Sequence, residues 1–154
     1  MGVSVMTQRS HSHGFKPVAM RKRGASRSRQ SYLNLYFHII FATKHRAPVL
    51  QKSVWPGLRE ALKTKATELK GVLHLANGYL DHVHLLLSLP PTISIATAVK
   101  HLKGYSSHQL PSVYWQNGYY AATVDRFSFD TIFNYIRGQW QKHATVDLVG
   151  DYEI

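Results

Sequence analysis

Hydrophobic and polar residues alternate along residues 33–41, where the chain reads "LNLYFHIIF". One set of alternate positions holds Leu33, Leu35, Phe37, Ile39 and Phe41, and the other holds Asn34, Tyr36, His38 and Ile40. Successive side chains of a strand point to opposite faces of its sheet, so this period of two predicts a β-strand. The aromatic and β-branched residues of this stretch, which are common in strands, support the same prediction.

The period changes to that of a helix over residues 53–70. The apolar residues that share one helical face are Val54, Leu58, Ala61, Leu62 and Leu69. Pro56 fits a helix only in its first turn, because proline lacks the N–H that an interior turn requires. Gly71 is the expected stop, since glycine commonly follows the last turn of a helix.

Five more elements are predicted after this helix. "VLHLANGYL" (72–80) and "HVHLLLSL" (82–89) are expected strands joined by a turn within residues 77–81, and Pro90-Pro91 ends the second. Ser94 is a suitable N-cap for a helix over 94–109. "GYYAATV" (118–124) predicts a fourth strand, and residues 130–143 predict a third helix capped by Asp130 or Ser128.

The resulting order is β-α-β-β-α-β-α. Its first six elements are the split β-α-β pattern of ferredoxin-like folds, so we expect an α+β domain with an antiparallel sheet. Both helices should cover one face of the sheet, leaving the other face free for a ligand or a partner. A further helix follows at the C-terminal end.

Charge is the strongest signal in the composition. The 154 residues contain 19 Lys and Arg against 8 Asp and Glu, a formal net charge of +11. Such a surplus favours a polyanionic partner, most often nucleic acid. Seven of the basic residues fall within residues 1–30 and all the acidic ones follow, so twelve bases face eight acids in the remainder, about +4.

This distribution suggests the domain boundaries. Residues 1–30 are rich in Ser, Arg and Gly without periodicity, which predicts a disordered basic arm. That arm is either a nucleic-acid-contacting extension or the result of a start assigned too far upstream. Residues 31–146 are expected to form a single domain, and 147–154 a short tail. The chain has no cysteine, which excludes disulfides and thiolate metal sites, and no long apolar run suggests a membrane partner.

Two histidines head the strand in "LDHVHLLLSLPP". His82 and His84 share one face of a strand and lie about 7 Å apart, close enough to bind one metal ion. A bare H-x-H is nevertheless more often structural. His11-Ser12-His13 has the same spacing in the polar arm, so a metal site needs further ligands and a rigid frame.

The last predicted helix offers such groups. Tyr135 and Gln139 are one turn apart and share a face with Lys142 and His143. Taken alone, Tyr135 is more readily interpreted as a packing residue than as a nucleophile.

The ordered set of segments resembles a known family. "YFHIIFATKHRAPVL", "DHVHLLLSLPP", "AVKHLKGYSSHQL", "WQNGYYAATV" and "NYIRGQWQKH" are similar to segments of the HUH single-tyrosine transposases of small bacterial and archaeal insertion sequences. The resemblance covers about residues 32–143. It departs from the family directly after Gln139, where Trp140-Gln141-Lys142-His143 has one histidine and no acidic residue.

The resemblance implies a catalytic domain that cuts and rejoins single-stranded DNA beside hairpins through a 5′-phosphotyrosine. It implies Tyr135 as the nucleophile and His82, His84 and Gln139 as ligands of a divalent metal, Mg²⁺ or Mn²⁺. It also implies a homodimer, in which the tyrosine helix of one subunit can act in trans, and a cytoplasmic, nucleoid-associated setting in a prokaryote.

Other residues are weaker candidates. Lys142 and His143 could activate the tyrosine, Asp81 could orient a histidine or cap the strand, and His38 could lie near the site. The residues considered for DNA contact are Lys44, His45, Arg46, Lys100 and Lys103. For each of these five, solvated surface charge is an equally good interpretation.

Three functions stay open on the sequence. The first is an active single-strand transposase, the second a non-catalytic nucleic-acid-binding domain of the same fold, and the third a domesticated nuclease acting on chromosomal repeat hairpins. The first leads because Tyr135, His82, His84 and Gln139 occur together.

Overall fold

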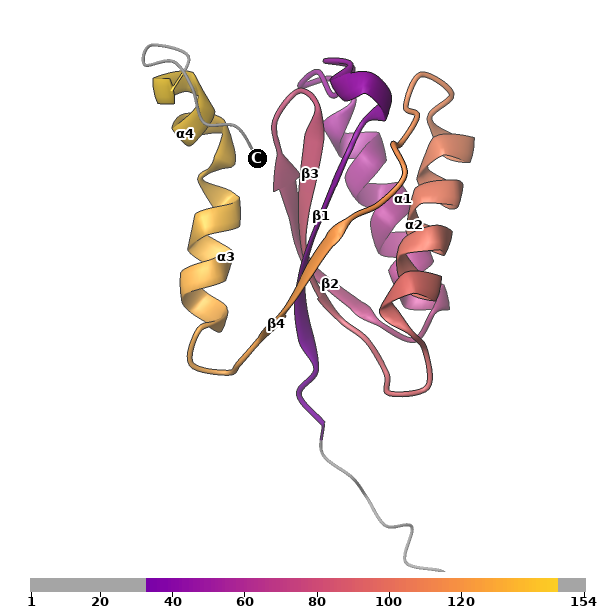
Figure 1. The fold of residues 1–154 in the computed structure, drawn as a ribbon, viewed down its shortest axis with the longest axis vertical. Helices are drawn as coiled ribbons and strands as arrows, with labels where there is room; N and C mark the ends of the chain where they lie inside the picture. Colours follow the sequence, from indigo (N-terminus) through magenta and orange to yellow (C-terminus); the bar gives the residue numbers. More distant parts are fainter. Residues whose placement is uncertain (1–32, 147–154) are drawn as a thin grey trace, which may run out of the picture. The chain divides into compact units, whose positions relative to one another are not determined.

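The computed structural model describes residues 33–146, so the predicted arm (1–30) and tail (147–154) lie outside the described residues. The elements, in chain order, are β1 (Tyr36–Ala42), the 3-10 turn η1 (Lys44–Arg46), α1 (Trp55–Glu68), β2 (Val72–Gly78), β3 (His82–Ser88), α2 (Ile95–Gln109), β4 (Tyr120–Val124), α3 (Phe129–Arg137) and α4 (Gln139–Val146) (Figure 1). The β-α-β-β-α-β-α order is therefore confirmed, with the last predicted helix divided in two.

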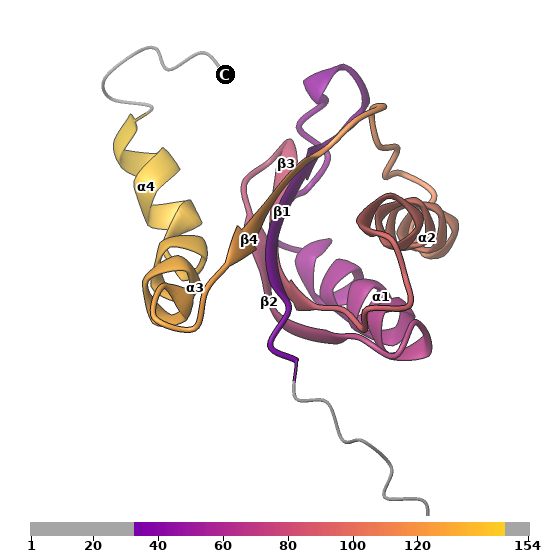
Figure 2. The same ribbon diagram turned by 60° about the horizontal axis from the view of Figure 1, so that its bottom comes forward.

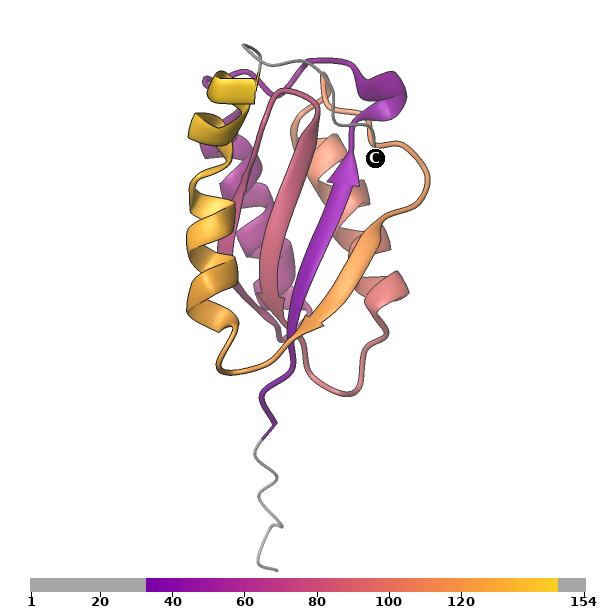
Figure 3. The ribbon, with the colours of Figure 1, turned by 60° about the vertical axis from the view of Figure 1, so that its left-hand side comes forward.

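The four strands form one antiparallel sheet in the order β2-β3-β1-β4 (Figure 3). The two central strands are the ones with the most regular apolar patterns in the sequence. The strand order and the two helical crossovers are those of a ferredoxin-like fold, which confirms the predicted α+β class. No helix within residues 33–146 is both long and apolar enough to cross a membrane.

Helices α1 and α2 cover one face of the sheet (Figure 2). β1 and β3 present their alternate apolar residues to this layer. The fully buried members of this core include Ile39, Leu58, Leu62, Leu85 and Leu102. The alternation within residues 37–41 is thus confirmed, because Phe37, Ile39 and Phe41 point to the core and His38 points away.

The opposite face is not free, contrary to the sequence-based expectation. Helices α3 and α4 lie on that side (Figure 2), and a second cluster joins α3 to the sheet through Leu86, Val124 and Ile136. α3 lies along β2 and β3, while β4 is on the far side of β1 (Figure 3). Leu86 shares its face of β3 with the two histidines. Its apolar side chain is buried by this contact with α3.

Several predicted boundaries shift by a few residues. β1 begins at Tyr36 rather than at residue 33, and Leu33 is exposed. α1 has Pro56 in its first turn as expected, but the left-handed residue after it is Lys70, with φ 61°, and not Gly71. Gly71 is required for space instead, because a Cβ there would lie 2.6 Å from the carbonyl oxygen of Ser88.

The predicted helix 130–143 is two helices that meet at Gly138. α3 begins at Phe129, after the N-cap Ser128, so the alternative cap Asp130 is wrong. The turn before it is held by Asp125, whose carboxylate accepts from the backbone N–H groups of Phe127 at 2.8 Å and Ser128 at 3.0 Å. In α2, Ser94 caps as predicted, accepting from the N–H of Thr97 at 3.1 Å.

Candidate active site

The histidine pair lies on the α3 face of the sheet because of strand register. In the β1–β3 ladder His84 is opposite Ile40 and His82 is opposite Ala42. His84 is buried and His82 is partly exposed. The pair therefore sits between the sheet and α3, one ring deep in the protein and one near its surface.

His84 hydrogen-bonds to a third histidine. Nδ1 of His84 lies 2.9 Å from Nε2 of His38, and the two rings are stacked with centroids 5.2 Å apart. His38 comes from the middle of β1 and is itself buried. It was only a weak candidate in the sequence, and the structure brings it against the H-x-H pair.

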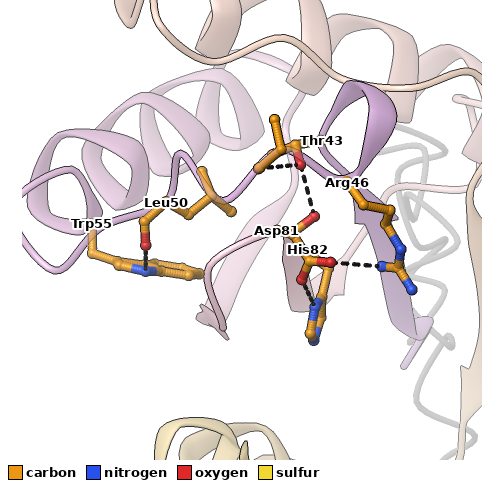
Figure 4. Close-up of polar contacts among 7 residues, drawn as sticks. Thr43, Arg46, Leu50, Trp55, Asp81 and His82 are labelled. Carbon is orange, nitrogen blue, oxygen red and sulfur yellow. Dashed lines mark hydrogen bonds and ion pairs between the residues drawn. The ribbon is translucent and has the colours of Figure 1, made fainter. Parts of the chain in front are cut away.

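His82 hydrogen-bonds to Asp81. Nδ1 of His82 lies 2.7 Å from Oδ1 of Asp81, and Nη1 of Arg46 lies 3.6 Å from Oδ2 of the same carboxylate (Figure 4). The backbone carbonyl of Asp81 accepts from Oγ1 of Thr43 at 3.1 Å. Arg46 thus contacts the carboxylate behind His82.

The loop after β1 is well anchored at this point. Thr43 is buried and its hydroxyl also lies 2.7 Å from the carbonyl of Ala47, while Nε1 of Trp55 donates to the carbonyl of Leu50 at 3.0 Å (Figure 4). Thr43 was not singled out in the sequence. A small polar residue at a strand end gives no signal of its own.

Tyr135 lies beside the histidines of its own chain. Its ring meets those of His84 and His38 edge to face, with centroids 5.8 Å and 6.1 Å apart, and its side chain stays partly exposed. Nζ of Lys142 lies 4.8 Å from the centroid of the same ring. A phenol, two imidazoles and an ammonium group thus surround one small area of the surface.

Asn77, which the sequence suggested only as a turn residue, holds α3 in this position. It is buried on β2, directly opposite His84, and its amide nitrogen donates to the carbonyls of Ile136 and Arg137, each at 3.0 Å. Nη2 of Arg59 donates to its amide oxygen at 3.3 Å. The last turn of the tyrosine helix is therefore tied to the strand next to the histidines.

Gln139 and His143 come from α4. Gln139 is only 1% exposed, and its amide nitrogen donates to the carbonyl of Tyr135 at 3.1 Å. The ring of His143 stacks on Tyr79 at 4.7 Å and meets His82 edge to face at 5.1 Å. Although Gly138 interrupts the helix, His143 still contacts His82, and Gln139 is bonded to the backbone of Tyr135.

The electrostatics of the pair suit metal coordination. Burial, helped by the neighbouring His82, His38, His143 and Lys142, lowers the pKa of His84 to about 3. Burial also lowers the pKa of His38. A metal ligand must be a neutral imidazole, and the hydrogen bonds through Nδ1 leave Nε2 of His82 and of His84 for a cation.

Two neutral imidazoles and an amide oxygen are a donor set that fits a divalent cation. Within residues 33–146 no three His, Asp or Glu side chains form a metal-binding group by themselves. Gln139, which the resemblance implied as the third ligand, lies on α4 with its amide nitrogen bonded to the carbonyl of Tyr135.

The predicted DNA-contacting residues lie elsewhere. Lys44, Lys100 and Lys103 line a pocket between α2 and the loop that precedes β4, together with Tyr114, Gln116 and Tyr119. His45 lines a second pocket beside it, which Lys44 and Tyr114 share. The five candidates thus divide between these pockets and, in the case of Arg46, the carboxylate behind His82.

Lys103 differs from the other lysines of the pocket. Its ammonium group donates to the carbonyl of Gln116 at 3.0 Å and also to that of Gly118, and burial lowers its pKa. It therefore fixes the loop before β4, whereas Lys44 and Lys100 are exposed.

Comparisons with known proteins identify the family of the chain. A family described as "Transposase IS200 like" matches residues 31–139. The ISDra2 transposase TnpA of Deinococcus radiodurans is 30% identical over 138 residues, 82% of this chain and 95% of that protein. A transposase for insertion sequence element IS200 from Salmonella typhimurium is 31% identical over 71% of this chain and 79% of its own.

Solved structures give the same result. A crystal structure of a Deinococcus radiodurans R1 transposase is similar with a TM-score of 0.57 and 32% identity, over 71% of this chain and 95% of the other. A REP-associated tyrosine transposase bound to a REP hairpin is similar in fold, with a TM-score of 0.56 and 18% identity, over 77% and 74%. Because the family match spans most of the chain and includes the H-x-H strand, Tyr135 and Gln139, this protein belongs to the IS200-like transposase family.

Proposed function

We propose that this transposase cleaves and rejoins single-stranded DNA at hairpin-flanked ends through a 5′-phosphotyrosine on Tyr135. The observation that carries the proposal is the position of Tyr135, whose partly exposed ring lies against His84 and His38. A nucleophile needs both access to its substrate and activating groups nearby. Tyr135 has both.

The covalent step exchanges one phosphate ester for another. The Tyr135 hydroxyl oxygen forms a bond to the phosphorus, the bond from phosphorus to the 3′-oxygen breaks, and the phenol proton passes to the solvent or to the leaving oxygen. The energy of the ester is kept in the protein–DNA link, so a second 3′-hydroxyl can attack it and restore a continuous strand without ATP.

His82, His84 and Gln139 would hold a divalent cation, Mg²⁺ or Mn²⁺, at this site. When bound, such an ion offsets charge on the non-bridging phosphate oxygens. Asp81 orients the ring of His82 through Nδ1. The amide of Gln139 is fixed by its bond to the backbone of Tyr135, which keeps this ligand one turn from the nucleophile.

Lys142 is the group best placed to assist the tyrosine. Its ammonium group lies over the Tyr135 ring, 4.8 Å from the centroid, in a cation–π contact that keeps a positive charge beside the nucleophile. His143 is held against Tyr79 and His82 instead, so its contribution would be to the position of the histidine pair.

The hairpin would be bound at the pocket between α2 and the loop that precedes β4. Lys44 and Lys100 supply exposed positive charge, and Tyr114 and Tyr119 supply exposed rings on which bases can stack. The relative bound to a REP hairpin supports DNA of this shape as the partner. A protein that only binds DNA would need this pocket and not Tyr135.

The active protein would be a homodimer, as expected for this family. Each chain brings Tyr135 to its own His84, which supports cleavage within one subunit, and exchange of the α3–α4 segment at the Asp125 turn would place it in trans. Mixing Tyr135→Phe with His84→Ala subunits tests this point. Adduct formation by the mixture, with neither variant active alone, would establish action in trans.

The central experiment uses labelled single-stranded hairpin DNA with Mn²⁺ or Mg²⁺, followed by denaturing electrophoresis. Wild type should form a covalent adduct, and Tyr135→Phe should form none. Tyr120→Phe is the matched control, because Tyr120 is also exposed and also meets the His38 ring, at 6.3 Å. An adduct that persists in Tyr135→Phe and disappears in Tyr120→Phe would overturn the assignment.

Two results would favour the alternatives. Hairpin binding without any adduct, unaffected by loss of His82, His84 and Tyr135, would indicate a non-catalytic binding protein. Cleavage restricted to chromosomal repeat hairpins would indicate a domesticated nuclease with the same chemistry.

A further inference from the structure

The hydrogen bond between His38 and His84 has no role in the chemistry proposed above. His38 lies in the middle of β1, which pairs with β3 on one side and β4 on the other. Only 8% of its surface is exposed. A buried polar ring at such a position needs a hydrogen-bond partner, and the partner it has is Nδ1 of His84 at 2.9 Å.

We infer that His38 is a positioning residue, which fixes the ring orientation and the tautomer of His84 so that Nε2 faces the cation. The inference rests on the proposed function in one respect, because it takes His82 and His84 as metal ligands. Metal-binding histidines depend on the hydrogen bond made by their other ring nitrogen. For His84 that bond is to another imidazole.

The strand register explains why β1 supplies this group. His84 is directly opposite Ile40, and His38 is two residues further along the same face of β1. Such diagonal neighbours in an antiparallel pair are within reach of long or aromatic side chains. The stacked arrangement of the two rings, 19° from parallel, is what this diagonal contact produces.

The two ligands are supported by acceptors of different charge, and burial accounts for the difference. Asp81, behind His82, keeps 27% of its side chain exposed and is also paired with Arg46. His84 is only 5% exposed, and a carboxylate placed behind it would be costly to remove from water. A neutral imidazole accepts a hydrogen bond there without that cost.

The arrangement dictates where the protons lie. If His84 binds the cation through Nε2, its proton must be on Nδ1, so His84 donates and Nε2 of His38 accepts. His38 must then carry its own proton on Nδ1. Metal binding therefore selects one of the two proton arrangements that this pair of rings can adopt.

The ring of His38 also faces the nucleophile. It meets Tyr135 edge to face at 6.1 Å and Tyr120 at 6.3 Å. A change in the orientation of His38 would therefore reach the metal ligand and the tyrosine together. His38 contacts His84 through a hydrogen bond, whereas it contacts the two tyrosines only through ring packing.

Calorimetric titration with Mn²⁺ tests the inference on folded protein without DNA. His38→Phe keeps a ring but removes the acceptor, and it should weaken Mn²⁺ binding by about 10- to 100-fold. His38→Gln places an amide oxygen near the position of Nε2 and should retain affinity within a few-fold. His74→Phe is the matched control, since His74 is another histidine on this side of the sheet, half-buried against Phe129 of α3, but its Nε2 bonds to Ser88.

The outcomes separate this inference from the proposed function. Loss of affinity in His38→Phe, with recovery in His38→Gln, supports it, and wild-type affinity in His38→Phe overturns it. If His82→Ala and His84→Ala also bind Mn²⁺ like wild type, the proposed metal site is wrong instead.

A second measurement covers the case in which His38→Phe does not fold. Nitrogen-15 NMR of wild type with a diamagnetic divalent ion should show both His38 and His84 protonated at Nδ1. A proton on Nε2 of His38 in the metal-bound protein would overturn the inference.

Discussion

Strand β3 contributes to both faces of the sheet, and the two faces are built differently. On one side Val83, Leu85 and Leu87 join a large apolar core with α1 and α2. On the other, His82, His84 and Leu86 lie under α3, where few apolar groups are fully buried. The first face is held by non-directional packing. The second depends on particular hydrogen bonds, so it can lose its arrangement while the fold survives.

Substitutions at two adjacent leucines should show the largest difference between the two faces of the sheet. Leu85 and Leu86 are both fully buried, one in each cluster. Leu85→Ala should lower the free energy of unfolding by about 4 kcal/mol, and Leu86→Ala by about 3 kcal/mol, because the smaller cluster can relax more easily. Urea unfolding measures both values.

Adduct formation should show the opposite order. Leu86→Ala loosens the seat of α3 and should reduce the adduct yield more than Leu85→Ala does under conditions where both variants are folded. Equal losses of yield would mean that the two faces do not differ in the way described.

Removal of the amide that holds α3 is the next largest expected effect. Asn77→Ala leaves the carbonyls of Ile136 and Arg137 without this donor and should cost about 2 kcal/mol. The adduct yield should fall as well, because the turn that carries Tyr135 is no longer fixed. Asn134→Ala, at an exposed position of α3, should change neither quantity.

Acid should weaken the α3 face of the metal-free protein. Burial lowers the pKa of His38, His74 and His84, in the last case from 6.5 to about 3. The unfolded chain therefore takes up protons first as the pH falls below 6.5. The contribution of these histidines to the free energy of unfolding is fully present above pH 6.5. It falls as the pH drops towards 3, by about 1.4 kcal/mol per pH unit from His84 alone.

Urea unfolding in EDTA at pH 7, 6 and 5 measures this slope. His84→Asn should flatten it, and His101→Asn, at an exposed position of α2, should leave it unchanged. A stability that rises as the pH falls would contradict the prediction.

The smallest effect is expected for a substitution on the side of the sheet that α1 and α2 cover, away from the site. Ser94→Ala removes the cap of α2 and should cost about 1 kcal/mol. The cap is remote from Tyr135, so the adduct yield should be unaffected once the protein is folded. A thermal unfolding curve and the adduct assay on the same sample are sufficient.

Local patterns predicted most of the fold. The period of two in residues 37–41 and the period of 3.6 in residues 55–68 reflect one buried face each, so the elements and their order follow from the sequence. The break in the last helix at Gly138 could not be predicted from the sequence, because a single glycine in an amphipathic stretch is compatible with a continuous helix. The α3 layer was missed because Leu86 alone signals little until its partners Val124 and Ile136 are known.

The site was only partly predictable for the same reason. The positions of His82 and His84 on one face follow from strand geometry, and a resemblance to a family suggested Tyr135 and Gln139 as their partners. The contacts of His38 and Asn77 depend on the register between strands far apart in the chain. Neither residue lies in a local pattern that would indicate its partner.

The order of the elements along the chain has a consequence for synthesis. A growing polypeptide that has reached Val124 contains all four strands and both histidines, but α3, from Phe129 to Arg137, is still missing. The two histidines that would bind the cation are therefore made before the group that would attack DNA, and Gln139 follows it. On the proposed function, an unfinished chain could fold its sheet on the ribosome and still lack the residue that breaks DNA, so the newly made protein would become reactive only after its last helices had been added.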